Sequence, residues 1–356
     1  MKRVLRFVGQ TLTIVAITLA LDFVVTATVF ADLKAGWIAA ERGNDDAYIT
    51  TPYDHDIRPD RTGTRVWGPI SYPWRADRFG FRTGACAERA PDPAGRHVFV
   101  IGDSFTEALG VSFETSFPGL IACDVERAGG QAWNLGVASY SPVIYHLKIR
   151  AAAERLGVRP SSIVIFLDLS DIDDDANIYS VDADGRVSSG SWGGWPRFKY
   201  QAGQFVVTHF SSARLVAHAV IGSLFTYARS QGRARARWAY DPKLMEKWGR
   251  RGLEVATGNM DRLAALCREW GCRLTLVVYP WPDNIAAGDR DSVQVRHWRD
   301  WAAGRGARFV DGFAPFFTGA AEETIRGHFI AGDVHFNERG HQLVFETVRK
   351  GVGGDW

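Results

Sequence analysis

The sequence predicts an α/β domain built on a parallel sheet that helices cover on both faces. Between residues 96 and 350, five short apolar runs of strand length alternate with longer segments of helical character. This alternation is typical of parallel sheets, because a helix usually makes the crossover from one parallel strand to the next. Ligand sites in such sheets lie at the carboxyl ends of the strands, so polar motifs that directly follow a strand are the first functional candidates.

The expected strands are short runs rich in β-branched and aromatic residues. The clearest is Ile163–Leu167, which leads into an acidic stretch. The last helix is expected to begin after Asn337, a good N-cap residue. The expected strands cover residues 97–101, 131–135, 163–167, 273–279 and 307–310, and the expected helices cover 141–156, 241–271, 291–305 and 338 to about 350.

The N-terminus carries an apolar run at residues 7–31, preceded by Lys2, Arg3 and Arg6. About 20 apolar residues suffice to span a bilayer, and the leading positive charges predict a cytoplasmic N-terminus with the remainder exported. We expect an uncleaved membrane anchor, although Asp22 would be costly at mid-membrane. The alternatives are a signal peptide cleaved after Val29–Ala31 and a core helix of a cytosolic protein.

The chain is expected to divide into a membrane segment (1–32), a linker with an extended arm (33–95) and a catalytic domain (96–350). An insertion at about 176–240 interrupts this domain with a turn-rich stretch, a mostly apolar segment at 211–228 and a basic run from Arg229 to Arg237. We expect the insertion to lie over the strand ends, where its basic run could bind an anionic polymer or the membrane surface. A solvated loop beside a packed helix is the alternative.

Charge and cysteine content exclude some classes of function. The formal net charge is +2, which makes no case for nucleic-acid binding. No CxxC motif and no His/Cys cluster of zinc spacing occurs, so we expect neither a metal nor another cofactor. The cysteines permit either four buried thiols or up to two disulfides, with three possible pairings. They are Cys86, Cys123, Cys267 and Cys272.

The strongest motif, Gly102-Asp103-Ser104-Phe105-Thr106, directly follows the first expected strand. A serine at this point has an exposed hydroxyl beside free backbone N–H groups and the positive end of a helix. These groups can stabilise an oxyanion, which makes Ser104 the candidate nucleophile. A polar turn in which Ser104 only caps the helix is the alternative. The lipase-type elbow G-x-S-x-G is a weaker match, because Thr106 stands in place of its second glycine.

The second motif is Asp333-Val334-His335-Phe336-Asn337. A serine hydroxyl needs a base to take its proton, and a histidine needs a carboxylate to fix its tautomer. Asp333 and His335 can share one loop ahead of the last helix, whereas His341 lies inside that helix and is expected to be structural. A surface loop and a metal-binding pair are the alternatives.

Three motifs together resemble the SGNH (GDSL-type) hydrolase superfamily: Gly102-Asp103-Ser104, Asn134-Leu135-Gly136 and Asp333-x-His335. The phrases GDSFTEALGV and NLGVASYSP are similar to bacterial envelope members. The resemblance covers roughly residues 75–350 without the insertion, and it implies a flavodoxin-like three-layer α/β/α fold. By family role, Ser104 is the nucleophile, His335 the base and Asp333 its orienter, while the N–H groups of Ser104 and Gly136 line the oxyanion hole.

The sequence departs from this family after the third strand. The family usually has an Asn there that donates to the oxyanion, but residues 167–171 read Leu-Asp-Leu-Ser-Asp. Ser170 aligns best and could donate through its hydroxyl. The loss of one oxyanion donor costs about 10²–10³ in rate.

The resemblance implies an enzyme anchored in a bacterial inner membrane, with its catalytic domain in the periplasm, or secreted if the leader is cleaved. Its expected reaction is the processing of small acyl esters, acetyl above all, of an envelope glycan through an acyl-enzyme at Ser104. Hydrolysis and transfer to a sugar hydroxyl use the same residues, and the anchored relatives include alginate-type O-acetyltransferases. A non-catalytic glycan-binding or assembly protein on the same fold is the third possibility.

Overall fold

The structure is a computed structural model that describes residues 2–31, 47–67, 70–87, 90–189, 206, 209–212 and 235–356. Contacts divide the chain into two units. One comprises residues 1–45 with 191–232, and the other comprises 46–190 with 233–356. The expected linker at 33–46 and most of the expected insertion, including the start of its basic run, lie outside the described residues.

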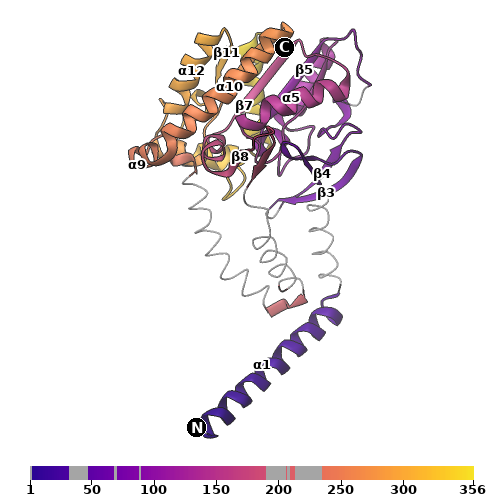
Figure 1. Ribbon diagram of the computed structural model, residues 1–356, viewed down its shortest axis with the longest axis vertical. Helices are drawn as coiled ribbons and strands as arrows, with labels where there is room; N and C mark the ends of the chain where they lie inside the picture. Colours follow the sequence, from indigo (N-terminus) through magenta and orange to yellow (C-terminus); the bar gives the residue numbers. More distant parts are fainter. Residues whose placement is uncertain are drawn as a thin grey trace. The chain divides into compact units, whose positions relative to one another are not determined.

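A parallel sheet of five strands forms the centre of the larger unit (Figure 1). Along the sheet the order is β11-β10-β7-β5-β6, which is the flavodoxin-like order that the sequence predicted. Every residue of the central strands β5 and β7 is buried, as expected when helices cover both faces. The strands are β5 His97–Gly102, β6 Gln131–Asn134, β7 Ser162–Leu167, β10 Arg273–Val278 and β11 Arg308–Asp311, each within one residue of its predicted bounds.

Helices form the outer layers of the predicted three-layer arrangement. Helices α5 (Pro142–Leu156), α10 (Arg250–Trp270) and α12 (Val293–Arg305) cover one face of the sheet. Helices α4 (Phe117–Arg127) and α14 (Glu338–Val352) cover the other. Shorter helical segments connect these elements: η1 Ala85–Ala87, α3 Ser104–Glu107, α6 Ser170–Asp173, η2 Asp174–Ile178, α9 Pro242–Leu244, η3 Met245–Gly249, α11 Pro282–Ala287, η4 Ala314–Phe317 and α13 Ala321–His328.

Two helices differ from the sequence prediction. Helix α4 was not predicted, and its start carries Pro118 and Gly119, which are typical of turns. Proline is tolerated in a first helical turn, and the Ser116 side chain caps this one by accepting the N–H of Gly119. The single helix expected at 241–271 is three consecutive segments, α9, η3 and α10.

The expected arm is two antiparallel hairpins within the larger unit. Strand β1 (Tyr48–Thr51) pairs with β2 (Asp54–Ile57), and β3 (Arg61–Trp67) pairs with β4 (Ile70–Ala76). A third hairpin, β8 (Tyr179–Val181) with β9 (Val187–Ser189), lies within the expected insertion and bonds to the arm through the Val187 N–H and the Pro52 carbonyl.

A buried charge cluster fixes the first hairpin to helix α5. Asp56 is fully buried, and it accepts hydrogen bonds from Tyr53 Oη at 2.8 Å, from Arg155 at 3.3 Å and from the ammonium group of Lys148. Lys148 is 1 % exposed. Because both charges are removed from water, each depends on the other for compensation.

The four cysteines form two disulfides. Cys86 pairs with Cys123 and Cys267 pairs with Cys272. This is one of the three pairings that the sequence left open. The first bond joins η1, just after the arm, to helix α4, and the second closes the turn between α10 and β10.

The smaller unit contains helix α1 (Lys2–Thr28). Its segment Gly9–Thr28 is 20 residues long with a mean hydropathy of 1.9, long and apolar enough to cross a membrane. By length and composition alone, a signal sequence passes the same test.

Removal of the buried Asp56 carboxylate should destabilise the larger unit. Asp56→Ala leaves the buried Lys148 ammonium without its main counter-charge, and we expect a loss of about 3–5 kcal/mol in the free energy of unfolding. Urea titration followed by tryptophan fluorescence would measure it. Glu269→Ala is the control, because its ion pair with Arg150 is exposed on both sides and should matter little. Equal effects of the two substitutions would contradict this role for Asp56.

Candidate active site

The candidate site lies where the chain reverses direction across the sheet. The chain passes from β5 outward to β6, then crosses back to β7 on the other side of β5. In sheets of this kind the crevice at the carboxyl ends of the two strands at the reversal is the usual ligand site. Ser104 follows β5 directly, and the acidic stretch from Asp168 follows β7.

Close packing around Thr106 brings the turns after β5 and β6 together. A Cβ atom on Gly102 would lie 2.2 Å from Thr106 Oγ1 and 2.6 Å from the Phe166 carbonyl oxygen. A Cβ atom on Gly136 would lie 2.5 Å from the Thr106 Cβ atom. Only glycine fits at these two positions, which explains the first residue of one motif and the last of the other.

The structure brings Ser104, His335 and Asp333 together as the sequence predicted. His335 Nε2 lies 2.9 Å from Ser104 Oγ, and His335 Nδ1 lies 2.6 Å from Asp333 Oδ1. The same aspartate oxygen accepts the backbone N–H of His335 at 3.0 Å. With the Nδ1 proton held by Asp333, the Nε2 lone pair faces the serine hydroxyl, the arrangement that a nucleophilic serine requires.

Aromatic rings hold the His335 imidazole in this orientation. The Trp67 ring meets it edge-on with 5.0 Å between centroids, and the Phe105 ring lies 4.7 Å away. Trp67 ends strand β3 of the arm, a contribution that the sequence analysis missed. Its indole Nε1 is buried and has no hydrogen-bond partner among the described residues.

The expected oxyanion donors have different surroundings. Ser104 begins helix α3, and no acceptor is seen for its N–H among the described residues. The Gly136 N–H donates to Asn134 Oδ1 at 3.0 Å. The Ser170 hydroxyl donates to Asp168 Oδ2 at 2.5 Å, so it is directed at a carboxylate. The oxyanion roles of Gly136 and Ser170 therefore stay predictions.

The loop that contains Gly136 is fixed by hydrogen bonds to both backbone groups of Ala138. Its N–H donates to the buried Glu107 carboxylate at 2.8 Å, and its carbonyl oxygen lies 2.8 Å from His55 Nε2. Arg65 and Tyr48 of the arm also donate to Glu107, at 2.6 Å and 2.9 Å. The sequence analysis missed Glu107, although it directly follows the serine motif.

The arm also fixes the end of helix α3. Arg82 is buried and donates to the carbonyl oxygen of Val111 at 2.7 Å, as well as to those of Glu107 and Ala108. Ala108 ends the helix in a left-handed conformation with φ of 65°. A single guanidinium therefore satisfies the carbonyl groups that a short helix leaves free.

Three buried carboxyl groups lie beside the nucleophile. Asp103, Asp168 and Asp171 have oxygen atoms that all lie within 4.8 Å of one another. Burial and the charge of Asp168 raise the pKa of Asp103 well above its ordinary range, and burial and the charge of Asp103 do the same for Asp171. Two like charges about 5 Å apart repel by roughly 3 kcal/mol at an effective dielectric constant of about 20, which favours the protonated forms of Asp103 and Asp171.

Hydrogen bonds orient this acidic cluster. Ser104 Oγ lies 3.2 Å from Asp103 Oδ2, Trp281 Nε1 donates to Asp168 at 2.5 Å, and Tyr145 Oη donates to Asp171 at 2.5 Å. Asp171 Oδ1 is buried and has no hydrogen-bond partner among the described residues. The spacing of the oxygen atoms would also suit a cation, but the donors already present occupy most of them.

His341 is structural, as expected from its place inside helix α14. It is 1 % exposed, and its Nδ1 atom accepts the N–H of Phe117 at 3.3 Å. Burial and the nearby Arg82 charge lower its pKa to about 3. The ring is therefore neutral and does not act as the base.

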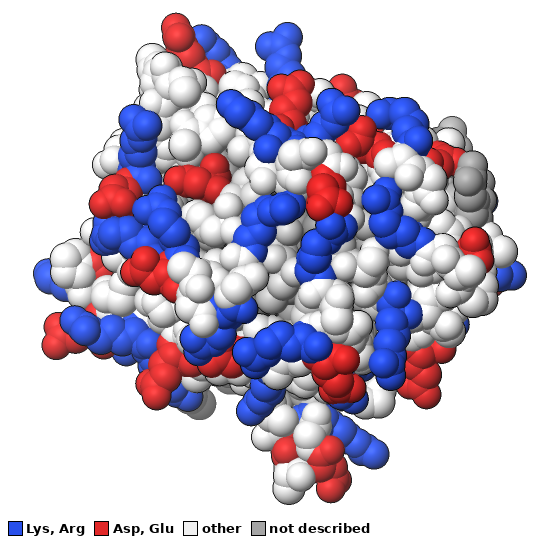
Figure 2. All heavy atoms as spheres, turned by 90° about the horizontal axis from the view of Figure 1, so that it is seen from above, with Lys and Arg blue, Asp and Glu red and all other residues white. Residues whose placement is uncertain are grey.

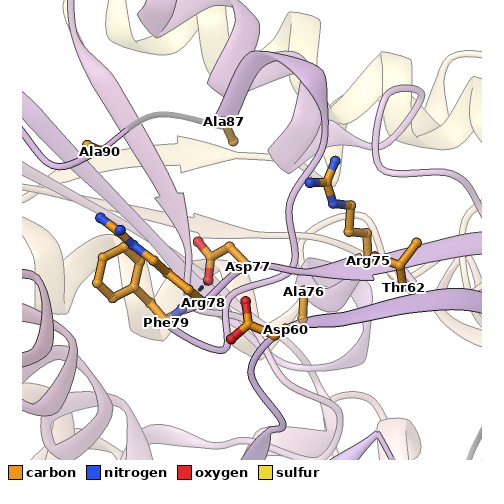
Figure 3. Close-up of a pocket in the computed structure, with 9 residues that line it drawn as sticks. All are labelled: Asp60, Thr62, Arg75, Ala76, Asp77, Arg78, Phe79, Ala87 and Ala90. Carbon is orange, nitrogen blue, oxygen red and sulfur yellow. Dashed lines mark hydrogen bonds between the residues drawn. The ribbon is translucent and has the colours of Figure 1, made fainter.

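Two surface hollows lie apart from Ser104, His335 and Asp333, the three residues that we call the triad. One of about 380 Å³ is lined by arm residues, with Asp60, Asp77 and Arg75 around it (Figure 3). The other, of about 600 Å³, is lined by Arg273 and Arg308 at the amino ends of β10 and β11, opposite the Ser104 edge. From above, basic and acidic side chains are interspersed over the surface (Figure 2).

Comparison with known proteins gives matches among solved structures only. No family model and no curated protein matches the chain, and 28 chains of solved structure are similar to it. Axe2, an acetylxylan esterase from Geobacillus stearothermophilus, is 12% identical with a TM-score of 0.42, covering 74% of this chain and 97% of that one. TesA is 14% identical with a TM-score of 0.40, covering 72% and 98%. A candidate SGNH hydrolase from Slackia heliotrinireducens is 14% identical with a TM-score of 0.37, covering 73% and 100%. Similarity at this level carries no argument about activity.

The acidic cluster should make stability fall as pH rises. Asp171 keeps its proton to higher pH in the folded protein than in the unfolded chain, whose carboxyl pKa is about 4. Above that pH the unfolded chain ionises first, and stability drops by up to about 1.4 kcal/mol per pH unit for this group. Asp171→Asn removes this dependence, so its stability relative to wild type should increase from pH 4 to pH 8.

Urea unfolding at successive pH values would measure this difference. Asp184→Asn, in an exposed turn, controls for the change in net charge. If wild type and Asp171→Asn lose stability in parallel as pH rises, the buried carboxyl group does not hold its proton.

Proposed function

We propose that this protein is a serine esterase of the SGNH type that forms an acyl-enzyme at Ser104. The observation that carries the proposal is the hydrogen-bonded chain from Ser104 Oγ through His335 to Asp333, with distances of 2.9 Å and 2.6 Å. Ser104 is more than 200 positions from Asp333 and His335 in the sequence. This series of hydrogen bonds is the arrangement that activates a serine hydroxyl. The family motifs around Ser104 and Asn134 support the same assignment.

The reaction follows from the geometry of the triad. Ser104 Oγ attacks the ester carbonyl carbon while His335 Nε2 takes the hydroxyl proton. The tetrahedral intermediate collapses, the carbon–oxygen bond to the leaving alcohol breaks, and His335 returns the proton to that alcohol. Water or a sugar hydroxyl then attacks the acyl-serine with His335 again as base, and Ser104 is released. Asp333 stabilises the imidazolium in both halves without taking its proton.

The Ser104 N–H is the first donor to the oxyanion, because it begins α3 beside the hydroxyl. The Gly136 N–H would join it when Asn134 gives up its hydrogen bond. Trp67 Nε1, buried beside His335 without an acceptor among the described residues, is a further donor that a bound ester could meet.

We propose a small acyl group, acetyl above all, and an envelope glycan as the alcohol part of the ester. The Trp67 and Phe105 rings pack against His335, which restricts the space beside the nucleophile and supports a short acyl chain. The apolar N-terminal helix supports a place at the outer face of a bacterial inner membrane, where envelope glycans are accessible.

Transfer of the acyl group to a polysaccharide hydroxyl is the second candidate function. It needs the same residues as hydrolysis and differs only in the acceptor. Commitment of the Ser170 hydroxyl to Asp168 favours a third candidate, a protein that binds glycans with weak catalysis, because it leaves the usual third donor without a replacement. The intact triad opposes that candidate.

Substitution within the triad should abolish turnover. Ser104→Ala removes the nucleophile and His335→Ala its base, and either should lower kcat by several orders of magnitude. The double variant should be little worse than either one, because the residues act as a unit. Asp333→Ala should cost less. Release of nitrophenol from a nitrophenyl acetate and labelling by a fluorophosphonate would measure these effects.

His341→Asn is the matched control, because His341 is also a buried histidine, with an exposed fraction of 1 %, but it bonds to Phe117 and not to Ser104. It should keep the fluorophosphonate label. A folded Ser104→Ala variant with full activity would refute the serine mechanism and leave the glycan-binding function. Adding an oligosaccharide acceptor to wild type distinguishes the other two: acetyl on the oligosaccharide indicates transfer, and free acetate alone indicates hydrolysis.

A further inference from the structure

Two polar residues of helix α1, Asp22 and Thr26, are shielded from solvent by another segment of the same unit. Asp22 and Thr26 are four residues apart and therefore share a face of the helix. Thr26 is fully buried and Asp22 is partly buried, whereas the other described side chains from Arg6 to Ala31 are exposed. What covers this face is the short segment 209–212, which comes from the expected insertion.

Five hydrogen bonds join the two segments. The Ser211 hydroxyl donates to Asp22 Oδ1 at 2.7 Å, and the Ser212 hydroxyl donates to Asp22 Oδ2 at 2.6 Å. The Ser212 N–H lies 3.2 Å from both carboxylate oxygens, and the Ser211 N–H donates to Thr26 Oγ1 at 2.9 Å. Every oxygen of the Asp22 carboxylate therefore has a hydroxyl donor and a backbone donor.

Ring contacts extend the same interface. The Phe23 ring stacks on His209 with 6.0 Å between centroids and an interplanar angle of 9°. It also meets Phe210 at 5.8 Å. Four consecutive residues of the insertion thus contact three positions within five residues of α1, which makes the contact a defined interface.

This interface supplies hydrogen-bond donors to the Asp22 carboxylate, which would be costly on a membrane helix without a partner. Asp22 lies six residues before the end of α1, roughly 9 Å along the helix axis at 1.5 Å per residue. A carboxylate at that depth in an apolar helix is costly and is usually paired inside a bundle. Donors from a second segment at the same depth remove most of that cost.

The sequence around this segment is itself suited to a membrane. Residues 200–228 contain a single Lys, Arg, Asp or Glu residue, Arg214, and are bounded by Lys199 and Arg229. We propose that residues 209–212 lie at membrane depth, and that the Phe210–Ser212 stretch binds Asp22 and Thr26 of α1 within the bilayer. Helix α1 is then a retained anchor, because cleavage after Ala31 would remove the partner of the two serines.

Cysteine cross-linking in membranes tests the proposal. The full chain carries an N-terminal epitope tag, a protease site within residues 32–46 and the pair Thr26→Cys with Ser211→Cys. After oxidation with copper phenanthroline and cleavage at the new site, the two fragments should run as one band and separate on reduction. The control pair is Thr28→Cys with Ser211→Cys, because residue 28 lies two positions on, at the opposite face and exposed. It should cross-link at least ten-fold more slowly.

The Asp22 carboxylate is tested in the same background. Asp22→Leu makes α1 more apolar and so a better general anchor, but it removes the acceptor, and it should slow cross-linking at least five-fold. Asp22→Asn keeps one acceptor oxygen and should be slowed less than Asp22→Leu. Equal rates for the Thr26 and Thr28 pairs, no effect of Asp22→Leu, or loss of the N-terminal tag from the mature protein would each overturn the proposal. None of these readouts depends on esterase activity.

Discussion

The active-site geometry depends on how closely two turns can approach around Thr106. Gly102 ends β5 and Gly136 follows β6, and both backbones press on the Thr106 side chain at distances that exclude a Cβ atom. This packing places Ser104 at the start of α3 and the Gly136 loop beside it. Without it, the Ser104 hydroxyl and the Gly136 N–H would belong to separate turns, and the proposed oxyanion site would not form.

The arm completes this arrangement. Its residues supply the Trp67 ring against His335, the Arg65 and Tyr48 donors to Glu107, and the Arg82 guanidinium at the end of α3. Glu107 in turn holds the Gly136 loop through the Ala138 N–H. Since the Asp56 cluster fixes the same arm to α5, a segment that reads as an extended connection in sequence helps to position the candidate site.

The sequence predicted those features that local patterns determine. The strands followed from apolar runs, and their order from the family resemblance. The triad followed from Gly-Asp-Ser after a strand and Asp-x-His before a helix. Trp67, Arg65 and Glu107 could not be assigned in the same way, because their roles come from contacts between residues 31 to 268 positions apart. The Asp22 contact escaped for the same reason, since Ser211 is 189 positions away.

The proposed esterase function has to accommodate an acidic cluster, because the usual Asn after β7 is absent from residues 167–171. Asp168 stands near the position where the family has its amide donor, and its carboxylate would repel an oxyanion if nothing offset its charge. The Ser170 hydroxyl and the Trp281 N–H donate to Asp168, and the raised pKa values of Asp103 and Asp171 favour the protonated, uncharged forms of its neighbours. Under the proposed mechanism, this limits the negative charge beside Ser104, where an oxyanion would develop. Ionisation of Asp103 or Asp171 at high pH would add negative charge at the same place, so the cluster links the stability of the fold to the electrostatics of the reaction.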